Sequence, residues 1–262
     1  MGYMCGRFAV TTDPALLAQK IQAIDEATAA AKDANTGPNY NVAPTTTIST
    51  VVKRHTEPDD ESTRRVRLMR WGLVPPWAKT ADDGGPDTKK GPLLINARAD
   101  KVTNSPAFRS SAKSKRCLVP MDGWYEWRPN GQSASGKAAP KTPFYMYGAD
   151  GEPLFMAGLW STWRPREKSG AASSEPPLMS CTIITTDAAG PLAEIHDRMP
   201  LTISAADWDR WLDPDAPIDE GLLRGHGDLD RIEIREVSRL VNSVRNNGPE
   251  LIEPAKPEPT LL

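Results

Sequence analysis

Cys117-Leu118-Val119-Pro120-Met121-Asp122-Gly123-Trp124-Tyr125-Glu126-Trp127 is the stretch that decides the fold, because it is typical of a strand with an internal turn. Short strand-like segments recur before and after it. We predict strands at residues 47–53, 66–73, 93–98, 144–147, 154–163, 179–186 and 232–237, after a short first strand that carries Cys5. The sequence therefore predicts one α+β domain with a barrel-like, mainly antiparallel sheet and flanking short helices.

Helical segments are expected to be few and separated. Thr12-Asp13-Pro14 is typical of a helix start, because Asp caps the first turn and Pro lacks an N–H that would find no partner there. We expect this helix to end at Gly37-Pro38. Further short helices are predicted after residue 105, around residue 192, after the capping Ser204 and from Asp219.

Three segments rich in Gly, Pro, Ser and Lys interrupt this pattern. They cover residues 79–92, 130–141 and 164–177, and we expect them to be flexible insertions. The end of the chain is rich in Pro and Glu. The predicted organisation is one domain over residues 4–250, followed by a disordered tail over residues 251–262.

Composition excludes several classes of protein. No apolar run approaches the about 20 residues of a membrane span, and the N-terminus lacks an apolar signal segment, so we expect a cytoplasmic protein without membrane contact. The net charge of −2 means that any nucleic-acid binding must come from a local groove. The three cysteines form no CxxC and the three histidines lack zinc-finger spacing, so we expect no metal and no cofactor.

Cys5 can be read in two ways. If translation begins at Met4 and this methionine is removed, Cys5 becomes a 1,2-aminothiol with a free α-amine beside its thiol. The amine can form an imine with an aldehyde, and the thiol can then close a thiazolidine ring. An α-amine titrates near pH 8 and a thiol near 8.5, so a fraction of each is reactive at neutral pH. The alternative is a buried apolar cysteine on the first strand.

Two strands carry a polar or reactive residue followed two positions later by arginine. Positions i and i+2 of a strand share a face, so Asn96 and Arg98 point the same way, as do Cys5 and Arg7. Arginine matches phosphate with two parallel hydrogen bonds. An ordinary surface strand can show the same residues.

Two further residues are suited to proton transfer. Glu126 shares a face with Trp124 among large rings, where burial should raise its pKa toward neutrality. His196 lies in a short loop between a predicted helix and a strand, and histidine shuttles protons near neutral pH. The alternatives are a carboxylate at the rim of an aromatic core and a structural histidine. Together with Cys5, these residues are also compatible with a cysteine peptidase acting on other proteins.

Tryptophans and arginines are interleaved in the middle of the chain. Unpaired bases stack on aromatic rings for about 1–3 kcal/mol each, while cations follow the phosphates. Most of these tryptophans are expected in the core, but we predict that Trp71 and Trp77, which bracket a Pro-rich turn, contact bases. A single-stranded DNA binder without covalent chemistry is therefore a further alternative.

Seven blocks of sequence closely resemble the SOS response-associated peptidase (SRAP) family of abasic-site processing proteins. In chain order they are Cys5-Gly6-Arg7-Phe8, Tyr40-Asn41-Val42-Ala43-Pro44, Arg70-Trp71-Gly72-Leu73-Val74-Pro75-Pro76-Trp77, Asn96-Ala97-Arg98, Arg116-Cys117-Leu118-Val119-Pro120, Gly123-Trp124-Tyr125-Glu126-Trp127 and His196-Asp197-Arg198-Met199-Pro200. They span nearly the whole chain, and the insertions fall between them.

The resemblance implies a DNA-damage response protein that crosslinks to abasic sites in single-stranded DNA, including junctions with duplex, through a thiazolidine on Cys5. It implies that Asn96 positions the nucleophile and that Glu126 transfers protons. It also implies that His196 serves imine formation and reversal of the crosslink. The DNA-binding residues implied by position are Arg7, Pro44, Trp71, Trp77, Arg98 and Thr185. An autopeptidase step and a lyase side reaction are also implied. We expect the protein to be a monomer and to associate with the nucleoid when it is bound to damaged DNA.

The start of the chain departs from the family pattern. Met1-Gly2-Tyr3 precedes Met4, so ordinary removal of Met1 would leave the nitrogen of Cys5 in a peptide bond. An amide nitrogen cannot form an imine. We therefore expect translation from Met4, with self-cleavage after Met4 as the alternative and inactivity of the longer chain as the third.

Overall fold

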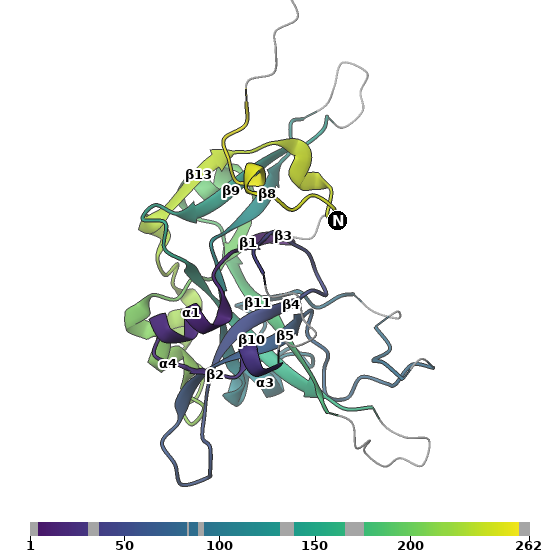
Figure 1. The fold of residues 1–262 in the computed structure, drawn as a ribbon, viewed down its shortest axis with the longest axis vertical. Helices are drawn as coiled ribbons and strands as arrows, with labels where there is room; N and C mark the ends of the chain where they lie inside the picture. Colours follow the sequence, from purple (N-terminus) through teal and green to yellow (C-terminus); the bar gives the residue numbers. More distant parts are fainter. Residues whose placement is uncertain are drawn as a thin grey trace, which may run out of the picture.

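Five strands form the first of two sheets, and their order does not follow the chain. The structure is a computed structural model that describes residues 5–30, 37–82, 84–88, 92–131, 139–165 and 176–256. The order of the first sheet is β13 (Ile232–Glu236), β9 (Thr142–Gly148), β8 (Gly123–Arg128), β1 (Phe8–Val10) and β3 (Asn39–Val42). All of its pairings are antiparallel, and Figure 1 shows this sheet in the upper half of the molecule.

The second sheet is longer and closes on itself. Its order is β12 (Arg198–Pro200), β11 (Leu178–Asp187), β10 (Leu154–Trp163), β7 (Arg116–Met121), β4 (Thr47–Arg54), β5 (Thr63–Trp71) and β2 (Ile24–Asp25), and β6 (Asn96–Arg98) pairs with β11. Strand β5 pairs with β4 and also, in parallel, with β11. The five strands from β11 through β10, β7 and β4 to β5 therefore form a closed ring. The predicted α+β class with a barrel-like, mainly antiparallel sheet is confirmed.

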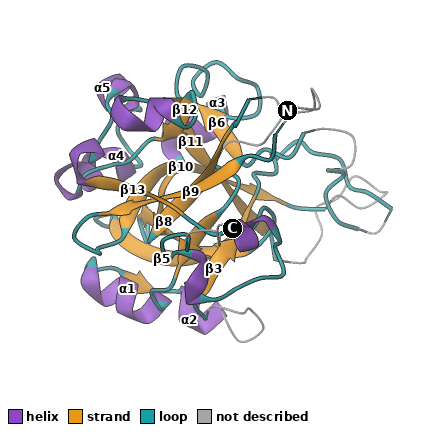
Figure 2. Ribbon diagram, turned by 90° about the horizontal axis from the view of Figure 1, so that it is seen from above, coloured by secondary structure: helices purple, strands orange, loops and turns teal. Residues whose placement is uncertain are grey.

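Short helices surround these strands (Figure 2). The α-helices are α1 (Pro14–Lys20), α2 (Ala27–Ala30), α3 (Arg109–Ser114), α4 (Trp208–Leu212) and α5 (Glu220–Arg224). The 3₁₀ helices are η2 (Gly190–Glu194), η3 (Ala205–Asp207), η4 (Leu229–Arg231), η5 (Arg239–Asn242) and η6 (Pro249–Leu251). The carboxylates of Asp13 and Asp219 accept hydrogen bonds from the first N–H groups of α1 and α5, as predicted.

Side-chain alternation on the strands produces separate cores. One cluster fills the space between the two sheets and includes Phe8, Trp71, Val119 and Trp124. A second lies where the helices pack on the outer face of the closed ring, around residues such as Trp211. A smaller third cluster covers the far face of the first sheet with the C-terminal segment. Strands β7 and β10 are consequently buried on both faces, which explains their nearly continuous apolar sequence.

Two predictions about boundaries are wrong. The first helix does not run to Gly37, because α1 ends at Lys20 and β2 then pairs beside β5. The tail is not disordered from residue 251, because Leu251 is fully buried and the N–H of Ala255 bonds to the carbonyl of Glu236. Residues 257–262 and the central parts of the predicted insertions lie outside the described residues.

Candidate functional site

Strand pairing places Cys5 beside Glu126. Strands β1 and β8 pair antiparallel with Phe8 opposite Trp124, so the residues before Phe8 run alongside Glu126. The backbone nitrogen of Cys5 donates a hydrogen bond to Oε1 of Glu126 over 2.6 Å. Side chains alternate along β8, so Glu126 faces the same interior as Trp124. The structure therefore joins the nitrogen of the candidate nucleophile directly to a carboxyl group.

Glu126 is held in a poorly solvated environment. Only 2% of the residue is exposed, and this burial raises the pKa of its carboxyl from 4.5 to about 8. The negative charge of Asp197 raises the pKa further, whereas the Cys5 N–H and the charge of Lys141 lower it. A carboxyl group with this pKa can accept and return a proton at neutral pH.

The thiol of Cys5 is not an activated thiolate. Cys5 is completely buried, and burial, with a smaller effect of the Glu126 charge, raises the pKa of the thiol well above its ordinary value. Its backbone φ is +41°, in the left-handed region that residues other than glycine rarely adopt. The sulfur is therefore protonated at neutral pH, and the chemical advantage of this residue lies in its nitrogen.

Asn96 enters the region from the second sheet. In the parallel pairing of β6 with β11, Asn96 lies opposite Ile183 and Arg98 opposite Thr185. Ile183 belongs to the same buried cluster as Cys5. Asn96 is half-buried and lies at the edge of this cluster, whereas Arg98, two residues further along the same face, is exposed.

His196 lies in the turn between η2 and β12. Its Nδ1 lies 2.8 Å from Oδ1 of Asp197 and 3.2 Å from the backbone nitrogen of Arg198, so both contacts use the same ring atom. The side chain is 28% exposed. The charge of Asp197 raises the pKa of both Glu126 and Arg98, so this turn lies near the buried carboxyl group and near the arginine of β6.

Arg7 is fixed by neutral partners. Its Nη1 donates to Oδ1 of Asn41 over 2.9 Å and to the carbonyl of Val241 over 3.0 Å. Partial burial lowers the pKa of the guanidinium. Because no carboxylate is among these partners, the positive charge of Arg7 is oriented without being neutralised.

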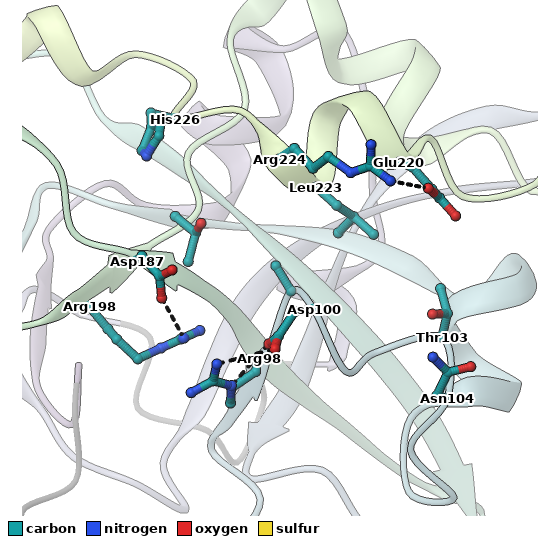
Figure 3. Close-up of a pocket in the computed structure, with 12 residues that line it drawn as sticks. Arg98, Asp100, Thr103, Asn104, Asp187, Arg198, Glu220, Leu223, Arg224 and His226 are labelled. Atoms are coloured by element: carbon teal, nitrogen blue, oxygen red, sulfur yellow. Dashed lines mark hydrogen bonds and ion pairs between the residues drawn. The ribbon is translucent and has the colours of Figure 1, made fainter.

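An open cavity of about 650 Å³ is lined by Arg98, Arg198 and residues near them. Figure 3 shows ion pairs among its lining residues, Arg98 with Asp100, Arg198 with Asp187 and Arg224 with Glu220. Arg98 is exposed, whereas Arg198 is only 6% exposed and also donates to the carbonyl and hydroxyl of Thr185. Three guanidinium groups and the three carboxylates paired with them therefore line this cavity, which adjoins the strand that carries Asn96.

Two predicted DNA contacts are wrong. Trp71 is fully buried, packs edge-on against Phe8 with ring centroids 5.0 Å apart, and donates from Nε1 to the carbonyl of Ile95. Thr185 is 1% exposed, and its oxygens are used by Arg198. Trp71 is therefore a core residue, and Thr185 positions an arginine. Trp77 is 64% exposed and Pro44 is half-buried, so their DNA contacts stay predictions.

Sequence reasoning missed the roles of Asn41 and Arg198. Both lie within blocks that had been singled out, but their types alone did not distinguish them from ordinary surface residues. Asn41 is 4% exposed and bonds Arg7, and Arg198 is buried beneath the cavity.

No group of three or more His, Cys, Asp or Glu side chains within the described residues could hold a metal ion. In the same part of the chain, no helix has the length and apolar character needed to cross a bilayer.

Comparison with known proteins assigns the family. Residues 4–244 match the model of the SOS response associated peptidase (SRAP) family. Abasic site processing protein YoqW of Bacillus subtilis is 38% identical over 221 residues, which cover 82% of this chain and 86% of that protein. YedK of Escherichia coli, with the same description, is 32% identical over 266 residues, covering 96% and 100%. HMCES of Gallus gallus is 32% identical over 242 residues, covering 83% and 66%.

A solved structure supports the fold. A protein from Bacteroides thetaiotaomicron superposes with a TM-score of 0.76 at 23% identity, covering 96% of this chain and all of that one. The family match extends over nearly all of the described strands and includes Cys5, Asn96, Glu126 and His196. This chain is therefore a member of the SRAP family.

Proposed function

We propose that this protein processes abasic sites in DNA and that it does so by covalent capture through the α-amine and thiol of Cys5. The observation that carries the proposal is the 2.6 Å hydrogen bond from the Cys5 nitrogen to a buried carboxyl group. An abasic site in its ring-opened form presents an aldehyde. A cysteine with a free amine can condense with that aldehyde, and Glu126 is placed to handle the protons involved.

The first stage is imine formation. Glu126 accepts a proton from the Cys5 ammonium, and the resulting neutral amine attacks C1′ of the open sugar. The carbinolamine then loses water, for which Glu126 or His196 returns a proton to the departing hydroxyl. Burial of Glu126, which raises the pKa of its carboxyl group toward neutrality, suits both steps, because such a group accepts and donates protons with little free-energy cost.

The second stage closes the ring. The sulfur of Cys5 adds to the imine carbon and the thiol proton passes to the nitrogen, which gives a thiazolidine without any further reagent. The high pKa of the thiol favours this order of events, because the sulfur stays protonated while the amine reacts first. If ring closure is prevented, the imine instead promotes β-elimination of the 3′ phosphate, which is a lyase outcome.

The strand itself is held outside this buried region. Arg98 and Arg198 face an open cavity and are suited to backbone phosphates, and the exposed Trp77 is suited to stacking on an unpaired base. Asn96 links the two regions, since it shares a strand face with Arg98 and borders the cluster that contains Cys5. All these groups come from one chain, so a monomer on single-stranded DNA, or at its junction with duplex, suffices.

The proposal requires the nitrogen of Cys5 to become an amine. Initiation at Met4 followed by methionine removal achieves this, and so does self-cleavage after Met4. In the self-cleavage route, the family's peptidase name would describe a single maturation step. The intact mass of protein purified from the native host distinguishes these routes from a chain that keeps residues 1–4.

The decisive experiment compares protein translated from Met4, the same protein with Cys5→Ser, and the same protein with its α-amine blocked. We expect the first to form a complex with an abasic oligonucleotide that survives denaturation. The other two should bind the oligonucleotide without forming the thiazolidine. Covalent capture after amine blocking would point to thiol-only chemistry. Failure of the unblocked protein to crosslink would reduce it to a non-covalent binder of single strands.

A further inference from the structure

Residues 238–247 form a segment that wraps around the Arg7 side of the site. It follows β13, contains η5, and lies near β1 and β3 in Figure 1. Asn41 anchors it, because Nδ2 of Asn41 donates to the carbonyls of Val241, Ser243 and Asn246 over 2.9–3.3 Å. The other end of the same amide accepts from Arg7. One buried side chain therefore fixes both Arg7 and the path of this segment.

Further contacts hold the segment rigidly against the first sheet. Val241 is fully buried in the cluster that contains Tyr125 and Tyr145. The N–H of Tyr40 donates to Oδ1 of Asn247 over 2.7 Å, and Nε1 of Trp127 donates to Oδ1 of Asn242 over 2.7 Å. The inward-facing side of the segment is thus committed to packing and hydrogen bonds.

The outward-facing side has a different character. Leu240 and Val244 are 52% and 55% exposed, and both belong to the small set of large apolar side chains that the described residues leave exposed. Arg239 and Arg245 are exposed beside them, and neither has an ion pair within the described part of the chain. By contrast, Arg64, Arg224 and Arg231 are all paired with carboxylates. Residues 238–247 contain no acidic residue, although Glu236, Glu250 and Glu253 line the same pocket as Arg239 and Leu240.

We propose that the outer face formed by Arg239, Leu240, Val244 and Arg245 is a further contact surface for single-stranded DNA, which receives the strand on the Arg7 side of the lesion. This inference rests on the proposed function. The charges suit phosphates, and the exposed aliphatic chains suit the faces of unstacked bases and sugars. Continuity with Arg7, whose own charge is not neutralised, favours nucleic acid as the occupant. The Arg98 cavity would then serve the other side of the lesion.

The test uses protein translated from Met4 with Arg239→Ala and Arg245→Ala together. The matched control is Arg109→Ala with Lys113→Ala, which removes two exposed charges from α3 on the helical side of the ring. With an oligothymidine of about 20 nucleotides, the first variant should bind roughly tenfold more weakly than the parent. Its salt dependence should be shallower by about 1.4 in the slope of log K against log salt. The control should match the parent.

Asymmetric oligonucleotides sharpen the test. An abasic site is placed at one end, with the strand extended only on its 5′ side or only on its 3′ side. The Arg239→Ala and Arg245→Ala variant should lose affinity for one of these oligonucleotides and keep it for the other. An equal loss on both, or binding indistinguishable from the control, overturns the inference. A second variant, Leu240→Ser with Val244→Ser, should weaken binding about threefold without changing the salt slope.

Two readouts keep these outcomes separate from other failures. Thermal unfolding shows whether the variants fold, which we expect because all four side chains are exposed. Crosslinking by the parent tests the proposed function itself. If the parent crosslinks and the variants bind like the control, only the surface is refuted.

Discussion

The two sides of the site differ in how they treat charge. On the side of Cys5 and Glu126, both groups are almost fully buried, and burial raises the pKa of the thiol and of the carboxyl. On the side of Arg98 and Arg198, guanidinium groups border an open cavity and are paired with Asp100 and Asp187. Burial therefore favours the neutral forms of Cys5 and Glu126, whereas Arg98 and Arg198 are charged and are paired with carboxylates.

This difference separates the residues proposed to react with the abasic sugar from the residues proposed to hold the DNA backbone. A proton can move cheaply only where neither protonation state is strongly preferred, and a dry environment around Glu126 achieves this at neutral pH. A phosphate, in contrast, is best held by fixed positive charges at a wet surface. Asn96 and Arg98 lie on one strand face and connect the two environments across only two residues. Substitutions on the two sides should therefore affect different measurements.

The largest effect is expected from Glu126→Gln. Glutamine keeps an oxygen that can accept from the Cys5 nitrogen, but it cannot take up a proton. The rate of crosslinking should fall by about 10²–10⁴, which is the typical contribution of a positioned general acid or base. Single-turnover kinetics with saturating abasic oligonucleotide measure the rate, and fluorescence anisotropy measures the affinity, which should stay within about twofold of the parent. A parallel loss of affinity would show that the two sides are not separable.

The next effect concerns the pH dependence of stability, in a chain that begins at Met1. Glu126 has a pKa of about 8 when folded and about 4.5 when unfolded. Between these values the folded protein keeps a proton that the unfolded chain releases, so the free energy of unfolding falls as pH rises. The slope should be as steep as about 1.4 kcal/mol per pH unit. Denaturant unfolding from pH 5 to 8 should show this slope in the parent and not in Glu126→Gln.

Protein translated from Met4 gives a control for that measurement. Its free ammonium at Cys5 favours the charged carboxylate and should make the slope shallower. A steep slope that survives in Glu126→Gln would assign the effect to another group.

A smaller effect is expected from Arg198→Ala. The buried guanidinium donates to Thr185 and Asp187, so its removal should lower the free energy of unfolding by about 2 kcal/mol. It should also weaken binding of an intact single strand about tenfold through loss of a phosphate contact. The crosslinking rate at saturating DNA should be almost unchanged. Arg198→Lys, which keeps the charge, should recover affinity more than stability, and the opposite result would make the residue purely structural.

The smallest effect is expected from Asp100→Asn. Asp100 holds Arg98 through contacts of 2.9 and 3.2 Å, and both side chains are about half exposed. Freeing Arg98 should strengthen DNA binding about twofold to threefold, while the free energy of unfolding should stay almost unchanged, because an exposed ion pair contributes little to stability. Weaker binding would mean that Asp100 orients Arg98 for DNA and does not compete with it.

The sequence predicted the strands well because their burial pattern is local. Residues 47–53, 154–163 and 179–186 were expected as strands and correspond to β4, β10 and β11. The placement of Cys5 beside Glu126 was harder to predict, because it depends on the register of β1 against β8. The resemblance to the family, and not the sequence pattern, predicted that Cys5 and Glu126 act in the same reaction.

Other features depend on contacts between distant parts of the chain. Trp71 and Trp77 lie close together in the sequence, yet Trp71 fills the core and Trp77 is exposed, because β5 ends at Trp71. The partners of Asn41 lie about 200 residues away. The fixed position of residues 251–256 likewise comes from pairing with β13 and its neighbours. No local property of the sequence reveals such contacts.

The left-handed φ of Cys5 has a consequence for maturation. Such a backbone angle costs an ordinary L-residue about 1–2 kcal/mol. This torsion is defined by the carbonyl carbon of residue 4, so it ceases to exist when the bond before Cys5 is cut. In the proposed self-cleavage route, cutting this bond would therefore also release backbone strain at Cys5, and the folded domain would favour the step that frees the α-amine.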